Sequence, residues 1–407
     1  MTFRRLMIAL AAAITLGSAL IQGQVPGRNV NMVSGRTLPD GDPFLQRQNE
    51  PSIAASTRNP LHLLAGANDY RTVDLPGLPD DVETGDAWMG LFKSTDGGNT
   101  WRSNLIPGYP QDIGSTSPLR NYQAAADPVV RAGTNGLFFY SGLVFDRATA
   151  ANPAPKSALF VTRFIDNNNK EAGDPIVFLG TTLVATNPGT AFIDKPWFAV
   201  DIPRPGSPMC SIATTQPNPT PGSPTATVTQ TQQFPGGAAY VVYSLIAGEG
   251  TSTKSQLFFS RSGDCGVTWS APLQISSSLD PVNQGSTIAI DPRTGTISVA
   301  WRRFSSDGTD DTIMVVRSSD QGRKWDPPGR ARRFPRGKKI GLRPEMHGKK
   351  FNRPVELADL TSLDQPHASA RPATHEIFRH LHGCSERRAG GRRRLCGADI
   401  ERVPPAR

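Results

Sequence analysis

Four side chains in this sequence are of types that could bind and transform a polar substrate: Asp69, Arg71, Asp127 and Arg303. An aspartate can give or take a proton, and the planar guanidinium of arginine can bind a carboxylate through two parallel hydrogen bonds. The alternative for any one of them is a surface ion pair or a strand-end cap, because charged side chains are common at protein surfaces. Their positions relative to the predicted strands decide between these roles.

Each candidate lies at the end of a predicted strand. Asp69 and Arg71 flank Tyr70 after the second strand of the first repeated unit described below, and Arg302 and Arg303 follow the equivalent strand of the last unit. Three acidic residues come just ahead of predicted opening strands, namely Glu50, Asp127 and Asp194. Strand ends that meet at one face of a sheet assembly are where binding residues usually lie.

A repeated turn indicates how these strands are arranged. Three copies occur: Ser94-Thr-Asp96-Gly-Gly98-Asn-Thr100-Trp101, Ser262-Gly-Asp264-Cys-Gly266-Val-Thr268-Trp269 and Ser318-Ser-Asp320-Gln-Gly322-Arg-Lys324-Trp325. A fourth, degenerate copy begins at Asp166 and lacks the Ser and the Trp. Glycine supplies backbone angles barred to other residues, and the Asp carboxylate can accept hydrogen bonds from nearby backbone N–H groups. The turns are therefore predicted to be structural.

A second repeated element opens each unit. The segment from Pro51 to Ala65 aligns without a gap with that from Ser286 to Ala300, and two further openings start near residues 128 and 196. Each unit then reads as a four-stranded antiparallel sheet, and such repeats predict an all-β propeller. The alternative is a set of unrelated hairpins that share their turn chemistry. In a propeller the repeated turns lie on one face and the long loops, with the candidate residues, on the other.

The Ser-x-Asp-x-Gly-x-Thr-Trp turn resembles the Asp box, or BNR repeat, of sialidases and related propellers. The resemblance covers residues 49–325 and implies a sialidase-type β-propeller, with six blades in the family and about four recognisable here. It implies that Arg71 or Arg303 holds the carboxylate of the sugar, and that Asp69 or Asp127 is the acid for the leaving oxygen. The Phe/Tyr-Arg-Ile-Pro element and the nucleophilic Tyr of sialidases have no recognisable equivalent.

Two functions are consistent with this resemblance. The first is a secreted sialidase-like glycoside hydrolase, an exo-α-sialidase if active, or its incomplete remnant. The second is a non-catalytic propeller that binds a glycan or a protein through its loop face. The expected partner is a glycan or glycoconjugate, and the oligomeric state is left open.

Residues 1–24 have the pattern of a secretory signal, because Arg4 and Arg5 precede an apolar run that ends in small and polar residues. We expect a secreted or periplasmic protein without a stable membrane span after signal removal; the alternative is an uncleaved anchor. Export makes a disulfide between Cys210 and Cys265 plausible. Neither cysteine has a C-x-x-C partner or a nearby His, so no metal site is expected there, and no cofactor is predicted.

The remaining boundaries follow from composition. Residues 25–48 are expected to form a linker, and residues 326–407 a disordered basic tail, with 19 Lys and Arg against 9 Asp and Glu. The rest of the chain is almost neutral, which argues against nucleic acid as a partner. The tail is interpreted either as a genuine basic extension that binds anionic surfaces or as the product of a changed reading frame, which we favour.

Overall fold

The computed structural model describes residues 29–33, 48–72, 86–147, 155–170, 173–217, 227–248, 252–305 and 311–334. These residues form eighteen strands and two short 3-10 helices, η1 (Pro118–Asn121) and η2 (Thr134–Gly136). The fold class is all-β, as predicted. The signal expected at residues 1–24 lies outside the described residues. Within the described ranges, no helix is long and apolar enough to cross a membrane.

The first two units are four-stranded antiparallel sheets, here called blades I and II. Blade I contains β1 (Gln48–Ala55), β2 (Leu63–Asp69), β3 (Trp88–Ser94) and β4 (Arg102–Leu105), in that spatial order. Blade II contains β5 (Ala124–Ala132), β6 (Leu137–Phe145), β7 (Ser157–Asp166) and β8 (Ile176–Asn187), again in order.

Blades III and IV follow the same plan with one insertion. Blade III contains β9 (Phe192–Val200), β12 (Ala239–Ala247), β13 (Lys254–Ser262) and β14 (Leu273–Gln274). Blade IV contains β15 (Val282–Ile290), β16 (Ile297–Phe304), β17 (Asp311–Ser318) and β18 (Gly329–Phe334). The insertion in blade III forms a separate hairpin of β10 (Met209–Pro217) and β11 (Thr227–Pro235).

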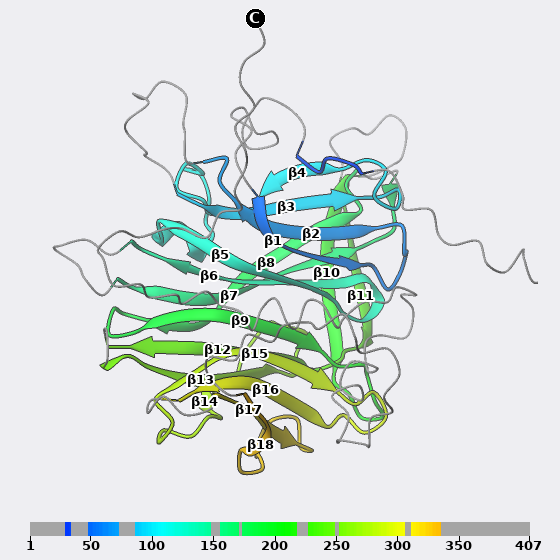
Figure 1. Ribbon diagram of the computed structural model, residues 1–407. Coiled ribbons are helices and arrows are strands. Elements are labelled where there is room, and N and C mark those ends of the chain that lie inside the picture. The colour runs from blue at the N-terminus through cyan, green and yellow to red at the C-terminus, as the bar shows by residue number, and fades with distance from the viewer. Residues whose placement is uncertain are drawn as a thin grey trace, which may run out of the picture.

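The blades lie side by side in chain order, so that blade I and blade IV are at opposite ends of the arrangement (Figure 1). The first strand of each blade contacts the first strand of the next, because β1 contacts β5, β5 contacts β9 and β9 contacts β15. This succession of inner strands is that of a propeller arc. We call the ends bearing the β1–β2 and β3–β4 turns, and their equivalents, the turn face, and the opposite ends the loop face.

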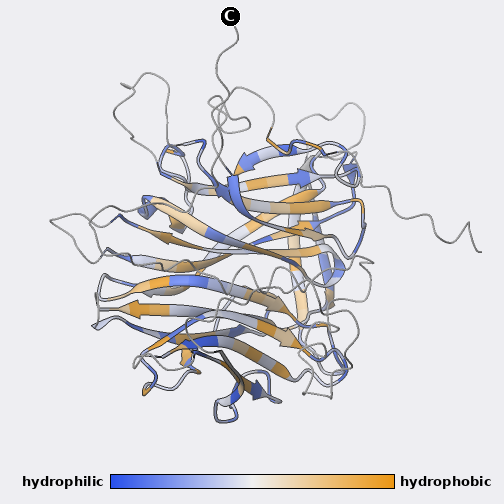
Figure 2. Ribbon diagram, in the orientation of Figure 1, coloured by the Kyte–Doolittle hydropathy of each residue, from blue (hydrophilic) through white to orange (hydrophobic). Residues whose placement is uncertain are grey.

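The hydrophobic core lies between neighbouring blades. One cluster, including Trp88 and Tyr140, joins blades I and II, and two more fill the spaces between blades II and III and between III and IV. Figure 2 shows hydrophobic residues concentrated on the strands, whereas the connecting turns are mostly hydrophilic. Tyr140 reaches across to donate a hydrogen bond to the carbonyl of Gly90 at 2.8 Å. A side chain at Gly66 would collide with this Tyr140 ring, so the close approach requires glycine there.

The three intact turns share the hydrogen bonds of their Ser hydroxyl, and in the third turn Lys324 replaces the Thr and donates only its backbone N–H to the Asp. In the first, the Ser94 hydroxyl donates to Asp96 at 2.8 Å and accepts from the Gly98 N–H at 2.9 Å. The Thr100 N–H and hydroxyl then donate to the Asp96 carboxylate at 2.9 and 2.6 Å. The carboxylate of the Asp in each intact turn thus accepts its hydrogen bonds from groups of the same turn. The predicted position of these turns is correct, because the Gly97 N–H donates to the carbonyl of Leu61 in the β1–β2 turn.

The degenerate copy at Asp166 has a different role. Its buried carboxylate accepts a hydrogen bond from Ser56 at 2.6 Å and contacts His62 Nδ1 at 2.9 Å. Both partners belong to blade I, so Asp166 links two blades in addition to bonding within its own turn. It also accepts a hydrogen bond from the N–H of Asn168 at 2.8 Å.

The β10–β11 hairpin connects three blades on the turn face. A disulfide joins Cys210 of β10 to Cys265 in the blade III turn, with the Cα atoms 5.9 Å apart, as the sequence suggested. Gln232 of β11 accepts a hydrogen bond from Arg58 of blade I and donates one to Asn167 of blade II, each at 2.5 Å. In Figure 1 the hairpin runs across the direction of the blade strands.

Two predicted boundaries differ from the structure. The inner strands begin at residues 48, 124, 192 and 282, three to four residues before the predicted starts. The prolines that were read as strand starts lie within the strands, next to β-bulges that accommodate them. The blades also extend past residue 325, because β18 pairs with β17 as the outer strand of blade IV. The expected tail beyond residue 334 lies outside the described residues.

Candidate functional site on the loop face

The inner strands of blades I to III carry a charged residue with positive φ at one repeated position. Glu50, Asp127 and Lys195 have φ of 51°, 61° and 47°, and each is followed directly by proline. A non-glycine residue in this backbone region costs about 1–3 kcal/mol, and such strain clusters at functional sites. At the equivalent position, blade IV has Gly285 with φ of 68°. The repeat thus places three strained, charged residues near the axis.

These three side chains meet. The Lys195 ammonium donates to Asp127 Oδ1 at 3.0 Å and contacts Glu50 Oε1 at 3.4 Å. The Lys195 backbone N–H donates to the other Asp127 oxygen at 3.2 Å. Next to them, Gln284 of blade IV donates to Asp194 at 3.0 Å. We call Glu50, Asp127, Asp194 and Lys195 the axial cluster.

Burial gives Asp127 unusual acid–base properties. Its side chain is 11% exposed, whereas those of Glu50 and Lys195 are 42% and 40% exposed. Burial raises the pKa of Asp127 to about 7, and a hydrogen bond with Glu50 and the charges of Asp194 and Glu50 act in the same direction, while Lys195 opposes them. A carboxyl with this pKa can give or take a proton at neutral pH.

Lys195 remains a cation in this environment. Burial lowers the pKa of its ammonium, but the charges of Asp127, Glu50 and Asp194 outweigh that effect and raise the pKa above its ordinary value. The ammonium can therefore stabilise whichever carboxyl of the cluster is ionised.

Asp69 and Arg71 lie elsewhere, contrary to their expected place on an open loop face. Both side chains are 0% exposed, and Arg71 Nε and Nη2 donate to Asp69 at 2.9 and 2.5 Å. Arg71 Nη1 also donates to Ser103 at 2.8 Å. Successive side chains of a strand alternate between its faces, so Asp69 points to the side of blade I away from blade II. The predicted acid and carboxylate-binding arginine thus satisfy each other.

Arg303 also has a carboxylate partner outside the axial cluster. Its Nη1 donates to Asp280 Oδ1 at 3.0 Å, and both side chains are mostly buried. The neighbouring Arg302 bonds Asp311 in the same way. Of the four predicted site residues, the structure brings only Asp127 to the axial cluster.

Glu50 and Lys195 are not among the catalytic candidates predicted from the sequence. The signal that could have found them is the charged residue–proline pair at the same position of three repeated units: Glu50-Pro51, Asp127-Pro128 and Lys195-Pro196. Because these positions are equivalent in a propeller, their side chains converge on its axis.

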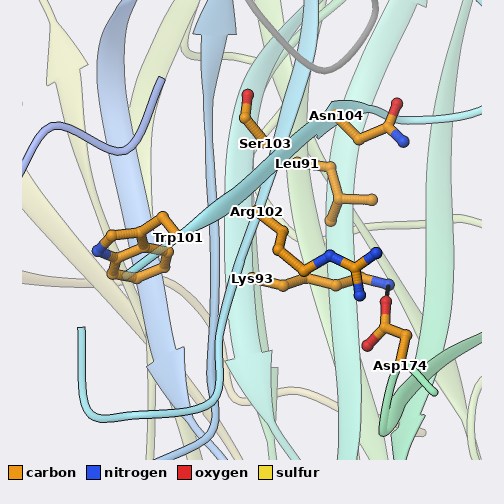
Figure 3. Close-up of a pocket in the computed structure, with 7 residues that line it drawn as sticks. All are labelled: Leu91, Lys93, Trp101, Arg102, Ser103, Asn104 and Asp174. Atoms are coloured by element: carbon orange, nitrogen blue, oxygen red, sulfur yellow. Dashed lines mark hydrogen bonds and ion pairs between the residues drawn. The ribbon is translucent and has the colours of Figure 1, made fainter. Parts of the chain in front are cut away.

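One surface depression of the described residues lies away from the axial cluster. It has a volume of about 290 Å³ and lies at the outer rim between blades I and II. Figure 3 shows its lining residues, which are Leu91, Lys93, Trp101, Arg102, Ser103, Asn104 and Asp174. Lys93 donates to Asp174 at 2.8 Å there, and the depression is open to solvent. None of its seven lining residues has a positive φ.

No protein-family model matches the chain, and no curated protein matches it by sequence. Among solved structures, a Hadza microbial sialidase is 15% identical with a TM-score of 0.37, covering 68% of this chain and 46% of that one. An α-L-arabinanase of Penicillium chrysogenum is 12% identical with a TM-score of 0.37, covering 70% and 67%. The NanB sialidase of Streptococcus pneumoniae is 12% identical with a TM-score of 0.34, covering 77% and 55%.

The chain therefore spans about half the length of these two sialidases. Likenesses at such low identity and TM-score assign no activity to this chain. The propeller-type fold follows from the strand order and inner-strand contacts described above.

Proposed function

We propose that the axial cluster is the active site of a secreted glycoside hydrolase in which Asp127 is the proton donor. The observation that supports this most is that carboxyls from two blades converge on one ammonium from a third, with the pKa of Asp127 raised to about 7. Cleavage of a glycosidic bond needs a carboxylic acid that is protonated near neutral pH beside a second, ionised carboxylate.

The chemistry follows from the positions of the two acids. Asp127 donates its proton to the leaving glycosidic oxygen as the bond between that oxygen and the sugar carbon breaks. Glu50, the more exposed carboxylate, stabilises the positive charge that develops on the sugar. A water then adds to the sugar carbon and returns a proton to Asp127. Lys195, 3.0 Å away, stabilises the Asp127 carboxylate in the interval.

The substrate class is a glycan, and the geometry does not favour a sialoside in particular. A sialidase needs a guanidinium available for the carboxylate of its substrate. Arg71 and Arg303 are the predicted candidates, and each already binds an aspartate. We therefore propose a hydrolase acting on glycosidic bonds generally, with sialosides as one member of the substrate panel.

A second function is favoured by the ion pairs of the same cluster. Lys195 forms ion pairs with both Glu50 and Asp127, an arrangement that also suits a polar surface that binds a glycan without cleaving it. Under this alternative the strained residues fix the shape of a binding site on the loop face.

A panel of fluorogenic glycosides, including a sialoside, separates the two functions. We expect turnover of at least one substrate, and a loss of about 10²- to 10⁴-fold in kcat for Asp127→Asn. Asp86→Asn is the matched control, because Asp86 is also ion-paired near the loop-face end of a strand, with Arg147, but lies outside the axial cluster. Undetectable turnover beside measurable glycan-array binding would discard the hydrolase in favour of the binding protein.

A further inference from the structure

Asn68 lies beside the axial cluster and bonds to both of its acids, Asp127 and Glu50. It lies in β2, is 6% exposed, and its side chain is on the face of blade I that packs against blade II. Its Oδ1 accepts a hydrogen bond from the backbone N–H of Asp127 at 2.8 Å. Its Nδ2 donates to Asn49 Oδ1 at 2.8 Å and to Glu50 Oε2 at 3.4 Å. The Asn68 amide thus contacts the backbone of the β5 bulge at Asp127 and the side chains of the β1 bulge at Asn49 and Glu50.

The bond to Asp127 replaces a missing sheet contact. Pairing between β5 and β6 shifts register between Ala126 and Val129, so Asp127 has no opposite partner in that ladder. A backbone N–H in this largely buried place needs an acceptor. Asn68 supplies the acceptor from the neighbouring blade, across the boundary between blades I and II.

The bond to Glu50 follows from the same orientation. Since Oδ1 must face the Asp127 N–H, the two hydrogens of Nδ2 point toward the β1 bulge, where Asn49 and Glu50 offer oxygens. An asparagine is the side chain that can accept on one side and donate on the other at this length. A leucine or an alanine could do neither.

We propose that Asn68 is a positioning residue that holds Asp127 and Glu50 in their strained backbone conformations and thereby fixes the distance between the two acids. Its consequence for hydrolysis rests on the proposed function, whereas its control of the two carboxyls does not. The charged groups that face Asp127 are Glu50 from β1 and Asp194 and Lys195 from β9, and Asn68 touches one of them.

The test uses the full chain with Asn68→Ala and Asn68→Asp, and Asn104→Ala as the control, since Asn104 is an exposed asparagine of the same blade. The readout is the titration midpoint of the Asp127 carboxyl, followed by carbon NMR. Asn68→Asp keeps an acceptor for the Asp127 N–H and adds a like charge, so the midpoint should rise by about one pH unit. Asn68→Ala releases the bulge and hydrates Asp127, so the midpoint should fall by about one unit.

The control should leave the midpoint unchanged. If both Asn68 variants also leave it unchanged, the positioning role is overturned, and the Asp variant alone decides should the Ala variant fail to fold. The pH profile of kcat should move with the midpoint if the cluster is catalytic. Shifted midpoints in a protein without turnover would support the role of Asn68 and contradict the proposed hydrolase.

Discussion

Asp96 on the turn face and Asp127 on the loop face are both aspartates, but their environments shift their pKa values in opposite directions. Hydrogen bonds from the Thr100 hydroxyl and N–H, and from Ser94, lower the pKa of Asp96 to about 2. Burial raises the pKa of Asp127 to about 7. The carboxylate in the conspicuous repeated motif is thus committed to its own turn. The Asp127 carboxyl accepts hydrogen bonds from Lys195, but its burial outweighs them and keeps it protonated up to about neutral pH.

The other intact turns agree with this contrast. Hydrogen bonds from Thr268 and Ser262 overcome the effect of burial and lower the pKa of Asp264. The backbone N–H of Lys324 does the same for Asp320. The repeated motif therefore belongs to the scaffold, whereas the residues of the axial cluster with positive φ lie at equivalent positions of different blades.

Asp69 shows whether burial by itself makes a carboxyl functional. It is more buried than Asp127, but Arg71 satisfies it. Asp69→Ala should lower the free energy of unfolding by about 3–5 kcal/mol, because it leaves the Arg71 cation buried without its partner. Urea denaturation measures this, with Asp86→Ala as the exposed-pair control. A loss of less than about 1 kcal/mol would mean that the pair behaves as a surface ion pair.

The disulfide tests whether the turn face can be weakened without affecting the axial cluster. Replacing both Cys210 and Cys265 by Ser should cost about 2–4 kcal/mol of stability, because the cross-link no longer restricts the unfolded chain. Thermal unfolding measures the loss. The Asp127 midpoint should stay where it is, since the disulfide lies on the opposite face. A moved midpoint would show that the two faces are coupled.

The smallest expected effects are in the dependence of stability on pH, and they run in opposite directions. The pKa of Asp96 falls from about 3.9 when unfolded to about 2 when folded, so its contribution is complete above pH ~4 and is lost as pH falls through about 2. The pKa of Asp127 rises from about 3.9 to about 7, so its contribution is present below pH ~4 and is lost as pH rises through about 7.

Two Asn variants measure these windows by denaturation between pH 3 and pH 8. Asp96→Asn should be less stable than the unsubstituted chain at pH 6, with the deficit shrinking toward pH 3. Asp127→Asn should gain relative stability between pH 5 and pH 8. If the stability of the two variants relative to the unsubstituted chain changed with pH in the same way, the pKa values of Asp96 and Asp127 would not be shifted in opposite directions.

The fold was predictable from the sequence because two elements, the Asp-containing turn and the opening strand, recur in the successive units. The Ser, Asp and Gly of each turn make bonds that their residue types predict, and the Cys210–Cys265 disulfide is the one that the predicted export suggests. The predicted strand starts are displaced because Pro51 and Pro128 indicate strand starts in the sequence, whereas bulges place them inside the strands.

The site was harder to predict than the fold. Asp69 was selected although its neighbour Asn68 faces the axis, because one residue of register decides which side of a strand a side chain takes. A bulge adds another residue and reverses that alternation. Asp127 was found because it is an acidic residue just ahead of a predicted opening strand, and Lys195 was missed because it is the basic member of an otherwise acidic set.

The most direct test of this account is to titrate the Asp127 and Asp96 carboxyls together in one sample of the unsubstituted protein by carbon NMR. We expect titration midpoints of about 7 for the Asp127 carboxyl and about 2 for the Asp96 carboxyl. Midpoints for both near the ordinary value of about 4 would show that the axial carboxyl is no different from those of the turns. The axial cluster would then lose its claim to be the active site.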